Sequence, residues 1–397
     1  MGVASARVPM PCSMMARPRI LITGGGTGGH TVPGLAVAAA LRARGIPCAW
    51  IGSRDGLEAR QAPEAGIPYF AIPTGKLRRS WAWANVTDVL VRVPAGTVRA
   101  CGLLLRLRPR VVLATGGFVA LPVVVAAWLA RVPVVVHEQT SVPGLANLLA
   151  ARLARRVAVT FPDTAGRLPA AKVVVTGNPL RPELRAAGRA DAVARLGLDP
   201  ALPLVYVTGG AQGAHALNRA AGEALPRLLG HAQLVHQCGD NPETGDRVWL
   251  EARRAALPPA LAARYTVRAW VGAELAGIYA AAALVVGRAG AGTVNECCHL
   301  GRPAIYIPLP GATGDEQTVN ARIVEAAGGA VVLPEATLSA QGLLQTVRAL
   351  LADPERTRRM GERARTLAVP DAALRIVELV LAIARGGERA GGKSDTG

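Results

Sequence analysis

Two glycine-rich segments, each ending in a histidine, contain residues suited to binding an anionic ligand or transferring a proton. Thr23–His30 reads TGGGTGGH and Thr208–His215 reads TGGAQGAH, and each segment follows a β-branched run and opens an Ala-rich helical stretch. Glycines at such a turn let main-chain amides approach a ligand, and the helix N-terminus favours an anion by about 0.3–2 kcal/mol per charge. The duplicated turn predicts a phosphate-containing ligand held between two domains of the same type.

The spacing Gly24-x-Gly26-x-x-Gly29 also matches the dinucleotide fingerprint, which makes a nicotinamide-dependent oxidoreductase one alternative. That fingerprint expects an acidic residue at the end of the second strand. Here the strand ends Ile51-Gly52-Ser53-Arg54, and Asp55 lies in the following loop. The incomplete match favours a different ligand. His30 directly follows the glycines, so we expect it to contact substrate or transfer a proton, and we expect His215 to contact phosphate or to be structural.

Short β-branched runs alternate with Ala/Leu-rich stretches along the whole chain, which is typical of parallel sheets with crossover helices. We therefore predict an α/β protein with two Rossmann-like, doubly wound parallel-sheet domains facing each other across a cleft. The predicted strands are 19–23, 48–52, 69–73, 111–115, 132–137, 157–161 and 173–177, then 204–208, 233–238, 265–271, 284–287, 304–308 and 330–333.

The Pro-rich segment Gly177–Pro182 lies between the two sets of strands and is the predicted hinge. We predict an N-terminal domain over 18–177, a C-terminal domain over 178–368, and a helix over 369–385 that packs back across the hinge. Residues 1–17 form an expected disordered leader without a signal-peptide pattern, and 386–397 an expected disordered tail. Met14 and Met15 are alternative starts to Met1.

The uncharged stretch Val111–Ala130 is long enough to span a membrane. Gly116, Gly117 and Pro122 interrupt it, so strand, loop, helix and strand are the favoured interpretation. A formal charge of +18 would attract phosphate, anionic lipid or nucleic acid. The positive charge comes almost entirely from scattered arginines, and no helix-turn-helix or zinc spacing is present, so nucleic-acid binding is not expected.

The six cysteines have no C-x-x-C spacing, and Cys297 and Cys298 are adjacent, which predicts free thiols. The chain has no Asp-x-Asp pair, no ligand cluster with metal spacing and no G-x-S-x-G elbow. The sequence therefore predicts neither a metal nor another cofactor, and no serine triad.

A series of motifs from Arg19 to about Arg365 resembles the MurG family, the UDP-N-acetylglucosamine transferases of GT-B fold that make lipid II of peptidoglycan from lipid I. The order and spacing of the motifs carry the resemblance. They are GGGTGGH (24–30), GKLRR (75–79), ATGGFVALP (114–122), HEQTSVPGLAN (137–147), TGNPLR (176–181), GGAQGAH (209–215), GRAGAGTVNE (287–296) and DEQTVNA (315–321).

The resemblance implies a donor site in the C-terminal domain for UDP-N-acetylglucosamine. Glu296 would accept hydrogen bonds from the ribose, and main chain near Val271 would meet the uracil edge. Gln317 would bind the sugar hydroxyls, Asn320 would support its loop, and Arg181 would help to neutralise the diphosphate. The other implied donor residues belong to two glycine-rich turns: Ala211, Gln212, Gly213, Ala291, Gly292, Thr293, Val294 and Asn295.

Thr27, Gly28, Gly29 and His30 would form the acceptor side and touch the donor sugar. The implied acceptor is the muramoyl sugar of a lipid-linked muramoyl-peptide. The implied reaction is an inverting displacement at the anomeric carbon, with His30 as the leading base and Glu138 as the alternative. Thr140 stands where the family usually has Asn, and Ala211 where it usually has Ser. These departures leave open a GT-B transferase for a different glycolipid, and a catalytically silent nucleotide-sugar module is a further alternative.

The segment around residue 80 interleaves cations with large apolar side chains. Basic residues near an anionic surface contribute about 1 kcal/mol each, and Trp favours the interface. We therefore expect peripheral attachment to the cytoplasmic face of the cell membrane, with cell-wall synthesis proteins as candidate partners; a loop packed on the core is the alternative. The expected membrane patch comprises Lys76, Leu77, Arg78, Arg79, Trp81 and Trp83.

Overall fold

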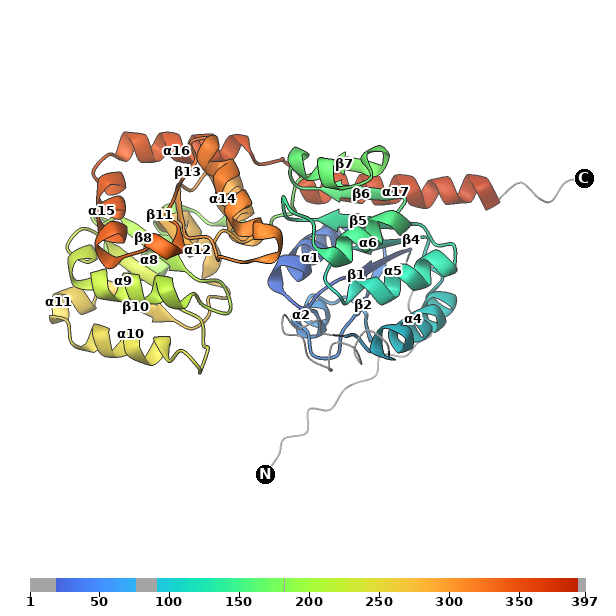
Figure 1. Ribbon diagram of the computed structural model, residues 1–397, viewed down its shortest axis with the longest axis horizontal. Coiled ribbons are helices and arrows are strands. Elements are labelled where there is room, and N and C mark those ends of the chain that lie inside the picture. The colour runs from blue at the N-terminus through green and yellow to red at the C-terminus, as the bar shows by residue number, and fades with distance from the viewer. Residues whose placement is uncertain (1–18, 76–90, 182, 392–397) are drawn as a thin grey trace, which may run out of the picture.

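The computed structural model describes residues 19–75, 91–181 and 183–391, which form two α/β domains lying side by side (Figure 1). The first domain has a parallel sheet of 7 strands in the order β3-β2-β1-β4-β5-β6-β7. Its strands are β1 (Ile20–Thr23), β2 (Cys48–Gly52), β3 (Tyr69–Ala71), β4 (Val111–Ala114), β5 (Val134–Glu138), β6 (Arg156–Val159) and β7 (Val173–Val175).

The second domain repeats this plan with a parallel sheet of 6 strands in the order β10-β9-β8-β11-β12-β13. Its strands are β8 (Leu204–Thr208), β9 (Gln233–Gln237), β10 (Tyr265–Arg268), β11 (Ala282–Gly287), β12 (Ala304–Tyr306) and β13 (Ala330–Val332). Strand order reverses at β1/β4 and at β8/β11. Ligands of doubly wound sheets bind at the carboxyl ends of the strands beside such a reversal.

Helices cover both faces of the first sheet and bury its central strands completely. They are α1 (Gly28–Ala43), α2 (Leu57–Glu64), α4 (Val93–Leu107), α5 (Ala120–Leu129) and α6 (Leu145–Leu153). Every residue of β1, β4 and β5 is buried, as expected for near-continuous Val, Ile and Leu runs between two helical layers.

The second sheet is covered in the same way. Its helices are α7 (Glu183–Ala186), α8 (Arg189–Arg195), α9 (His215–Leu228), α10 (Asp246–Ala255), α11 (Pro259–Ala262), α12 (Leu275–Ala281), α13 (Ala291–Leu300), α14 (Glu316–Ala326), α15 (Ala340–Leu351) and α16 (Pro354–Thr366).

The last helix, α17 (Ala372–Gly391), returns to the first domain and lies along it in Figure 1. Ile376, Val377 and Val380 of this helix are buried in one cluster with Ile20 and Leu113 of the first sheet. The first domain is therefore built from two separated parts of the chain. The helix also includes residues 386–391, which the sequence analysis assigned to a disordered tail.

All thirteen predicted strands are present, and their ends differ from the prediction by at most three residues. The uncharged stretch Val111–Ala130 forms β4, a glycine turn and α5, as predicted. No helix among the described residues is long and apolar enough to cross a membrane. The five cysteines in the described part of the chain are free. The predicted leader and the membrane patch at 76–83 lie outside the described residues.

Candidate active site

The loops that follow β1, β4 and β5 meet at the carboxyl edge of the first sheet, around the imidazole of His30. His30 Nδ1 lies 3.1 Å from the carbonyl oxygen of Thr115 and 3.1 Å from Oε1 of Gln139. Both neighbours are hydrogen-bond acceptors, so Nδ1 must carry the proton. In the neutral imidazole the other ring nitrogen, Nε2, then has a lone pair that can accept a proton.

A chain of hydrogen bonds behind His30 enforces this tautomer. The buried His137 donates from Nε2 to the carbonyl oxygen of Gly177 at 3.1 Å, which leaves its Nδ1 as an acceptor. Gln139 Nε2 donates to that Nδ1 at 3.1 Å and to Thr115 O at 2.6 Å, which turns Gln139 Oε1 toward His30. Burial lowers the pKa of His137 to about 4, so His137 stays neutral and keeps the chain in this direction at neutral pH.

Two glycines of the ATGGF motif make room for the His30 ring. A Cβ atom on Gly116 would lie 2.9 Å from His30 Nδ1, and one on Gly117 would lie 2.5 Å from the carbonyl oxygen of Gly25. Both residues also have positive φ, at 100° and 78°. A side chain at either position would displace the imidazole or the first glycine turn, which explains why the motif needs this pair.

Glu138, the alternative base, is 2% exposed and its carboxylate is already in use. Oε1 accepts from the main-chain amide of Thr140 at 3.0 Å, and Oε2 accepts from Asn147 Nδ2 at 2.8 Å. The Thr140 hydroxyl also faces inward, 2.9 Å from Glu138 Oε1 and 2.6 Å from Val142 O. Glu138 and Thr140 therefore shape the loop after β5, and this geometry favours His30 over Glu138 as the base.

The first glycine turn differs from a phosphate-binding turn because a carboxylate already occupies it. Glu58 of α2 is fully buried and accepts from Gly26 N at 2.9 Å. Ser53 donates to the other oxygen of Glu58 from its main-chain amide at 3.0 Å and from its hydroxyl at 2.6 Å. A diphosphate on these amides would meet a buried negative charge. The dinucleotide interpretation and the idea that both turns bind phosphate are therefore not supported by this turn.

The second glycine turn stays open to a ligand. Ala211 and Gln212 are exposed at its tip, Gly213 is half-buried, and Gly210 has open space where a Cβ atom would be. Below the turn, His215 Nδ1 lies 2.8 Å from Oδ1 of the buried Asp246, a residue that the sequence analysis did not single out. Asp246 also accepts from Asn218 Nδ2 at 2.8 Å and orients the first turn of α9.

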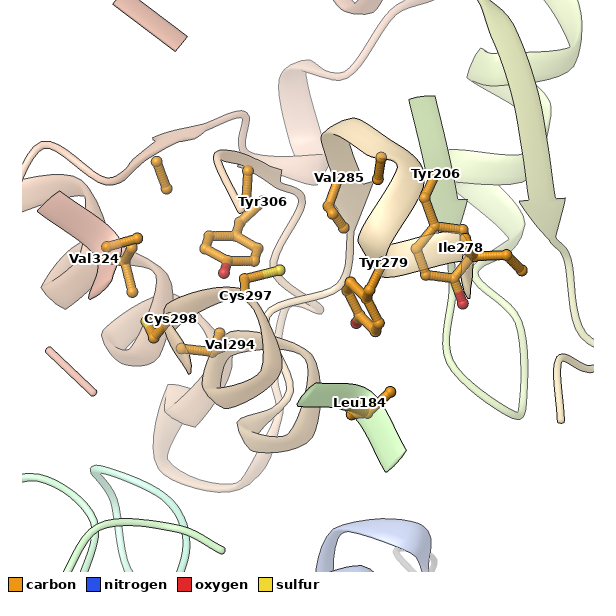
Figure 2. Close-up of a cluster of buried hydrophobic side chains, with 14 of the residues drawn as sticks. Leu184, Tyr206, Ile278, Tyr279, Val285, Val294, Cys297, Cys298, Tyr306 and Val324 are labelled. Carbon is orange, nitrogen blue, oxygen red and sulfur yellow. The ribbon is translucent and has the colours of Figure 1, made fainter. Parts of the chain in front are cut away.

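One face of the helix α13 is buried in the core, and its other face is only half-buried. Figure 2 shows Val294, Cys297 and Cys298 in the hydrophobic cluster with Tyr306, and all three are at most 3% exposed. Glu296 lies off this face and is half-buried, and its Oε2 accepts from the Tyr279 hydroxyl at 2.8 Å. Burial raises the pKa of Glu296, while the Tyr279 hydrogen bond and the charge of Arg181 oppose that rise. A partly desolvated carboxylate is a strong acceptor for hydroxyl donors.

Arg181 and Gln317 each have a polar group available to a ligand. Arg181 lies in the hinge segment, is half-buried, and its buried Nε has no hydrogen-bond partner among the described residues. Gln317 is in the first turn of α14, where its Oε1 accepts from Leu309 N at 3.0 Å. That bond leaves the Gln317 amide nitrogen available as a donor.

Asn320 clasps the two domains together at their carboxyl edges. Its Oδ1 accepts from the Ser141 hydroxyl at 2.7 Å and from Ser141 N at 3.2 Å, and its Nδ2 donates to Ala289 O at 3.2 Å. Asn320 is fully buried. Ser141 follows β5 and Ala289 follows β11, so the loops at the carboxyl ends of both sheets face each other. We call these three residues the interdomain clasp.

Family models match both halves of the chain. The glycosyltransferase family 28 N-terminal domain matches residues 20–159, and the C-terminal domain of that family matches residues 204–376. The chain belongs to glycosyltransferase family 28.

Named relatives match more than nine tenths of the chain. A UDP-N-acetylglucosamine–N-acetylmuramyl-(pentapeptide) pyrophosphoryl-undecaprenol N-acetylglucosamine transferase from Alkalilimnicola ehrlichii is 43% identical, over 92% of this chain and 99% of that protein. The enzyme of the same name from a Nocardioides species is 41% identical, over 93% and 99%. The crystal structure of Acinetobacter baumannii MurG matches with a TM-score of 0.69 and 30% identity, over 91% of this chain and 99% of that one.

The predicted site residues of this family 28 chain fall into two groups. The first group lies on elements that meet between the domains: His30 is on α1 and Glu296 on α13, which contact each other, and Gln317 is one helical turn before Asn320 of the clasp. The second group consists of three residues predicted to bind substrate whose side chains have other partners. Val294 is in the core, and Asn320 is in the clasp. Asn295 donates from Nδ2 to Asn178 O of the hinge at 3.1 Å. Val271 is 3% exposed, so only its main chain is available to a base.

The sequence analysis missed several residues that the structure brings into the site. Gln139, His137 and Ser141 act through the His30 chain and the clasp. All three lie in the HEQTSVPGLAN motif (137–147), which was the signal that could have found them. The described residues contain no group of three or more His, Cys, Asp or Glu side chains that could hold a metal ion.

Proposed function

We propose that this chain transfers N-acetylglucosamine from UDP-N-acetylglucosamine to the muramoyl sugar of a pyrophosphoryl-undecaprenol-linked acceptor. Curated relatives at up to 43% identity carry that activity in their names, and they align over nearly the full chain. The observation that carries the proposal is the free Nε2 of His30 beside a loop that the clasp joins to the donor side of the second domain.

In the proposed mechanism the acceptor hydroxyl loses its proton to His30 Nε2 while its oxygen attacks the anomeric carbon of the donor sugar. The bond from that carbon to the UDP oxygen breaks on the opposite face, so the configuration inverts and UDP leaves with the electron pair. Arg181 and the amides of the second glycine turn would stabilise the departing diphosphate. Glu296 would bind the ribose, Gln317 the sugar hydroxyls, and Thr27, Gly28 and Gly29 would line the acceptor.

The donor side is supported by the asymmetry of the two glycine turns. The first turn has its Gly26 amide bound to the Glu58 carboxylate, whereas the tip of the second turn is open. Ala211 offers only main-chain donors there, and the Thr140 hydroxyl faces into its own loop. Because Thr140 and Ala211 depart from the family pattern, a second candidate function stays open, in which the same chemistry acts on a different glycolipid.

The direct test incubates the chain with UDP-N-acetylglucosamine and a short-chain analogue of the lipid-linked acceptor, and measures UDP release and the glycosylated product. We expect turnover with this pair, and the same rate after EDTA is added. Turnover only with another sugar nucleotide or another acceptor would replace the first candidate by the second. UDP binding without any transfer would contradict both.

We further propose that the N-terminal domain attaches peripherally to an anionic membrane. Exposed apolar side chains cluster on the packed helices α4 and α5, namely Val98, Leu105, Trp128 and Leu129, each at least 56% exposed. Apolar side chains with cations nearby favour an anionic lipid interface. Sedimentation with phosphatidylglycerol vesicles should bring down the chain, and L105E/W128E should reduce this at least severalfold. Equal binding by the double variant would contradict this surface.

A further inference from the structure

Four arginines gather on the second domain, away from the candidate active site. They are Arg185 of α7, Arg189 of α8, Arg302 just after α13, and Arg365 of α16. They line two pockets with volumes of about 390 Å³ and 470 Å³, and both pockets contain Arg302 and Arg365. Volumes of this size are typical of small-molecule sites. Neither pocket shares a lining residue with the active site described above.

The positive charge of this arginine cluster is poorly compensated by carboxylates. Arg189, Arg302 and Arg365 donate to the main-chain carbonyls of Ala281, Ala282 and Leu300 at 3.1–3.2 Å. Arg185 has a more distant ion pair with Asp371, at 3.7 Å. Among the described residues that line the pockets, the only carboxylate is Glu362, and it already pairs with Arg358.

Arg302 is the arginine of this cluster that is most affected by burial and by the neighbouring positive charges. Its pKa is lowered by burial and by the positive charges of Arg189 and Arg365. Its Nε is buried and has no hydrogen-bond partner among the described residues. His299 beside it has its pKa lowered to about 4 by burial and by Arg185, so the imidazole is neutral and adds no repulsion at pH 7. Holding partly buried guanidinium groups close together costs electrostatic free energy. A bound polyvalent anion would offset that cost.

We propose that the arginine cluster is a second anion site, which binds a phosphate-bearing ligand of about the size of inorganic diphosphate. Arginine forks bind phosphate oxygens in pairs, and several forks around one small pocket suit a polyanion better than a single carboxylate. The site also touches both connections between the domains. Leu184 and Arg185 follow the hinge, and Ala368 and Pro370 precede α17, so a bound anion contacts the two crossings at once.

The test titrates inorganic diphosphate into the full chain by calorimetry at low salt, with and without saturating UDP. UDP fills the donor site, so the diphosphate binding that survives it reports the second site, and no transfer assay is needed. We expect one UDP-independent site. R185Q/R365Q, which changes two arginines of the pocket that touches both connections, should weaken it at least tenfold, while R227Q/R348Q, which removes the same charge from exposed positions outside both pockets, should leave it unchanged.

Thermal unfolding of both double variants checks that they fold, and the single variant R365Q replaces the first if it does not. A matched set of vesicle sedimentations with phosphatidylglycerol or phosphatidylcholine separates a free anion from a lipid headgroup. Loss of diphosphate binding in R185Q/R365Q supports a free ligand, and loss of anionic-vesicle binding alone supports a headgroup. No UDP-independent binding of either probe, or equal losses in the two double variants, would overturn the proposal.

Discussion

At the scale of single residues, the most informative group is one imidazole whose tautomer is set by acceptors. A neutral histidine that donates from Nδ1 to two oxygens presents an unprotonated Nε2, which is the form a general base needs. The residues that enforce this, Gln139 and His137, touch no substrate in the proposed mechanism. They are positioning residues, and they act because each has a fixed donor and acceptor side.

The first residue-scale prediction concerns His30. H30Q removes the base but keeps a polar side chain, so kcat should fall by about 10²–10⁴. Calorimetry should give nearly the same Kd for UDP, because the donor residues are in the other domain. The exposed His231 offers a matched control, and H231Q should retain full kcat. A wild-type kcat in H30Q would exclude His30 as the base.

The second concerns Glu296, which we place against the ribose. A hydrogen bond to a charged group is worth about 1.5–3 kcal/mol, so E296Q should weaken UDP binding roughly 10- to 150-fold. E243Q changes an exposed carboxylate in the same domain and should have no effect. The measurement is the Kd for UDP. If Kd does not change while kcat collapses, Glu296 has a different role.

At the scale of elements, the interdomain clasp links the loop after β5 to the turn after β11. Its partners Ser141 and Asn320 are 179 residues apart in sequence. Since the loop after β5 also contains Gln139, the clasp couples the loop that sets the His30 tautomer to the loop beside Gln317. In the proposed mechanism, one buried amide thus aligns the donor and acceptor halves of the site.

N320A should therefore lower kcat by about tenfold or more, since each buried group left unsatisfied costs about 1–3 kcal/mol and the loops lose their alignment. The Kd for UDP should change much less. S141A should have a smaller effect, and the double variant S141A/N320A should be no worse than N320A alone if the two act through one bond. Additive losses would show that they act separately. N241A, on an exposed loop, is the control for an Asn-to-Ala change.

At the scale of the whole molecule, buried neutral histidines in both domains link stability to pH. Burial lowers the pKa of His137 to about 4 and that of His236 to about 3, from an ordinary 6.5. Between pH 6.5 and 4 the unfolded chain binds protons that the folded chain does not. The free energy of unfolding should therefore fall as the pH drops through this window, by up to about 1.4 kcal/mol per pH unit for each histidine.

Urea unfolding at several pH values between 7 and 4 measures this slope. H236Q, although less stable at pH 7, should show a shallower slope, because it removes a group that titrates only when unfolded. H231Q changes an exposed histidine and should keep the wild-type slope. Parallel slopes for H236Q and wild type would mean that other groups, not this histidine, control the acid limit.

The sequence by itself determined the thirteen strands, the two-domain plan and the two glycine turns. These features depend on local periodicity and on glycine placement, which a single chain displays directly. It also placed His30 at a helix start beside a turn and Glu296 on a helix after a glycine-rich loop. The local elements that hold these two candidate residues were therefore predictable.

Only the tertiary structure decided what those residues can do. Glu58 occupies the first glycine turn from 32 residues away, and the two acceptors that set the His30 tautomer lie 85 and 109 residues away. The clasp and the packing of α17 on the first sheet join still more distant parts of the chain. Such contacts leave no period in the sequence, because burial and hydrogen-bond direction are set by which loops the folded sheets bring together.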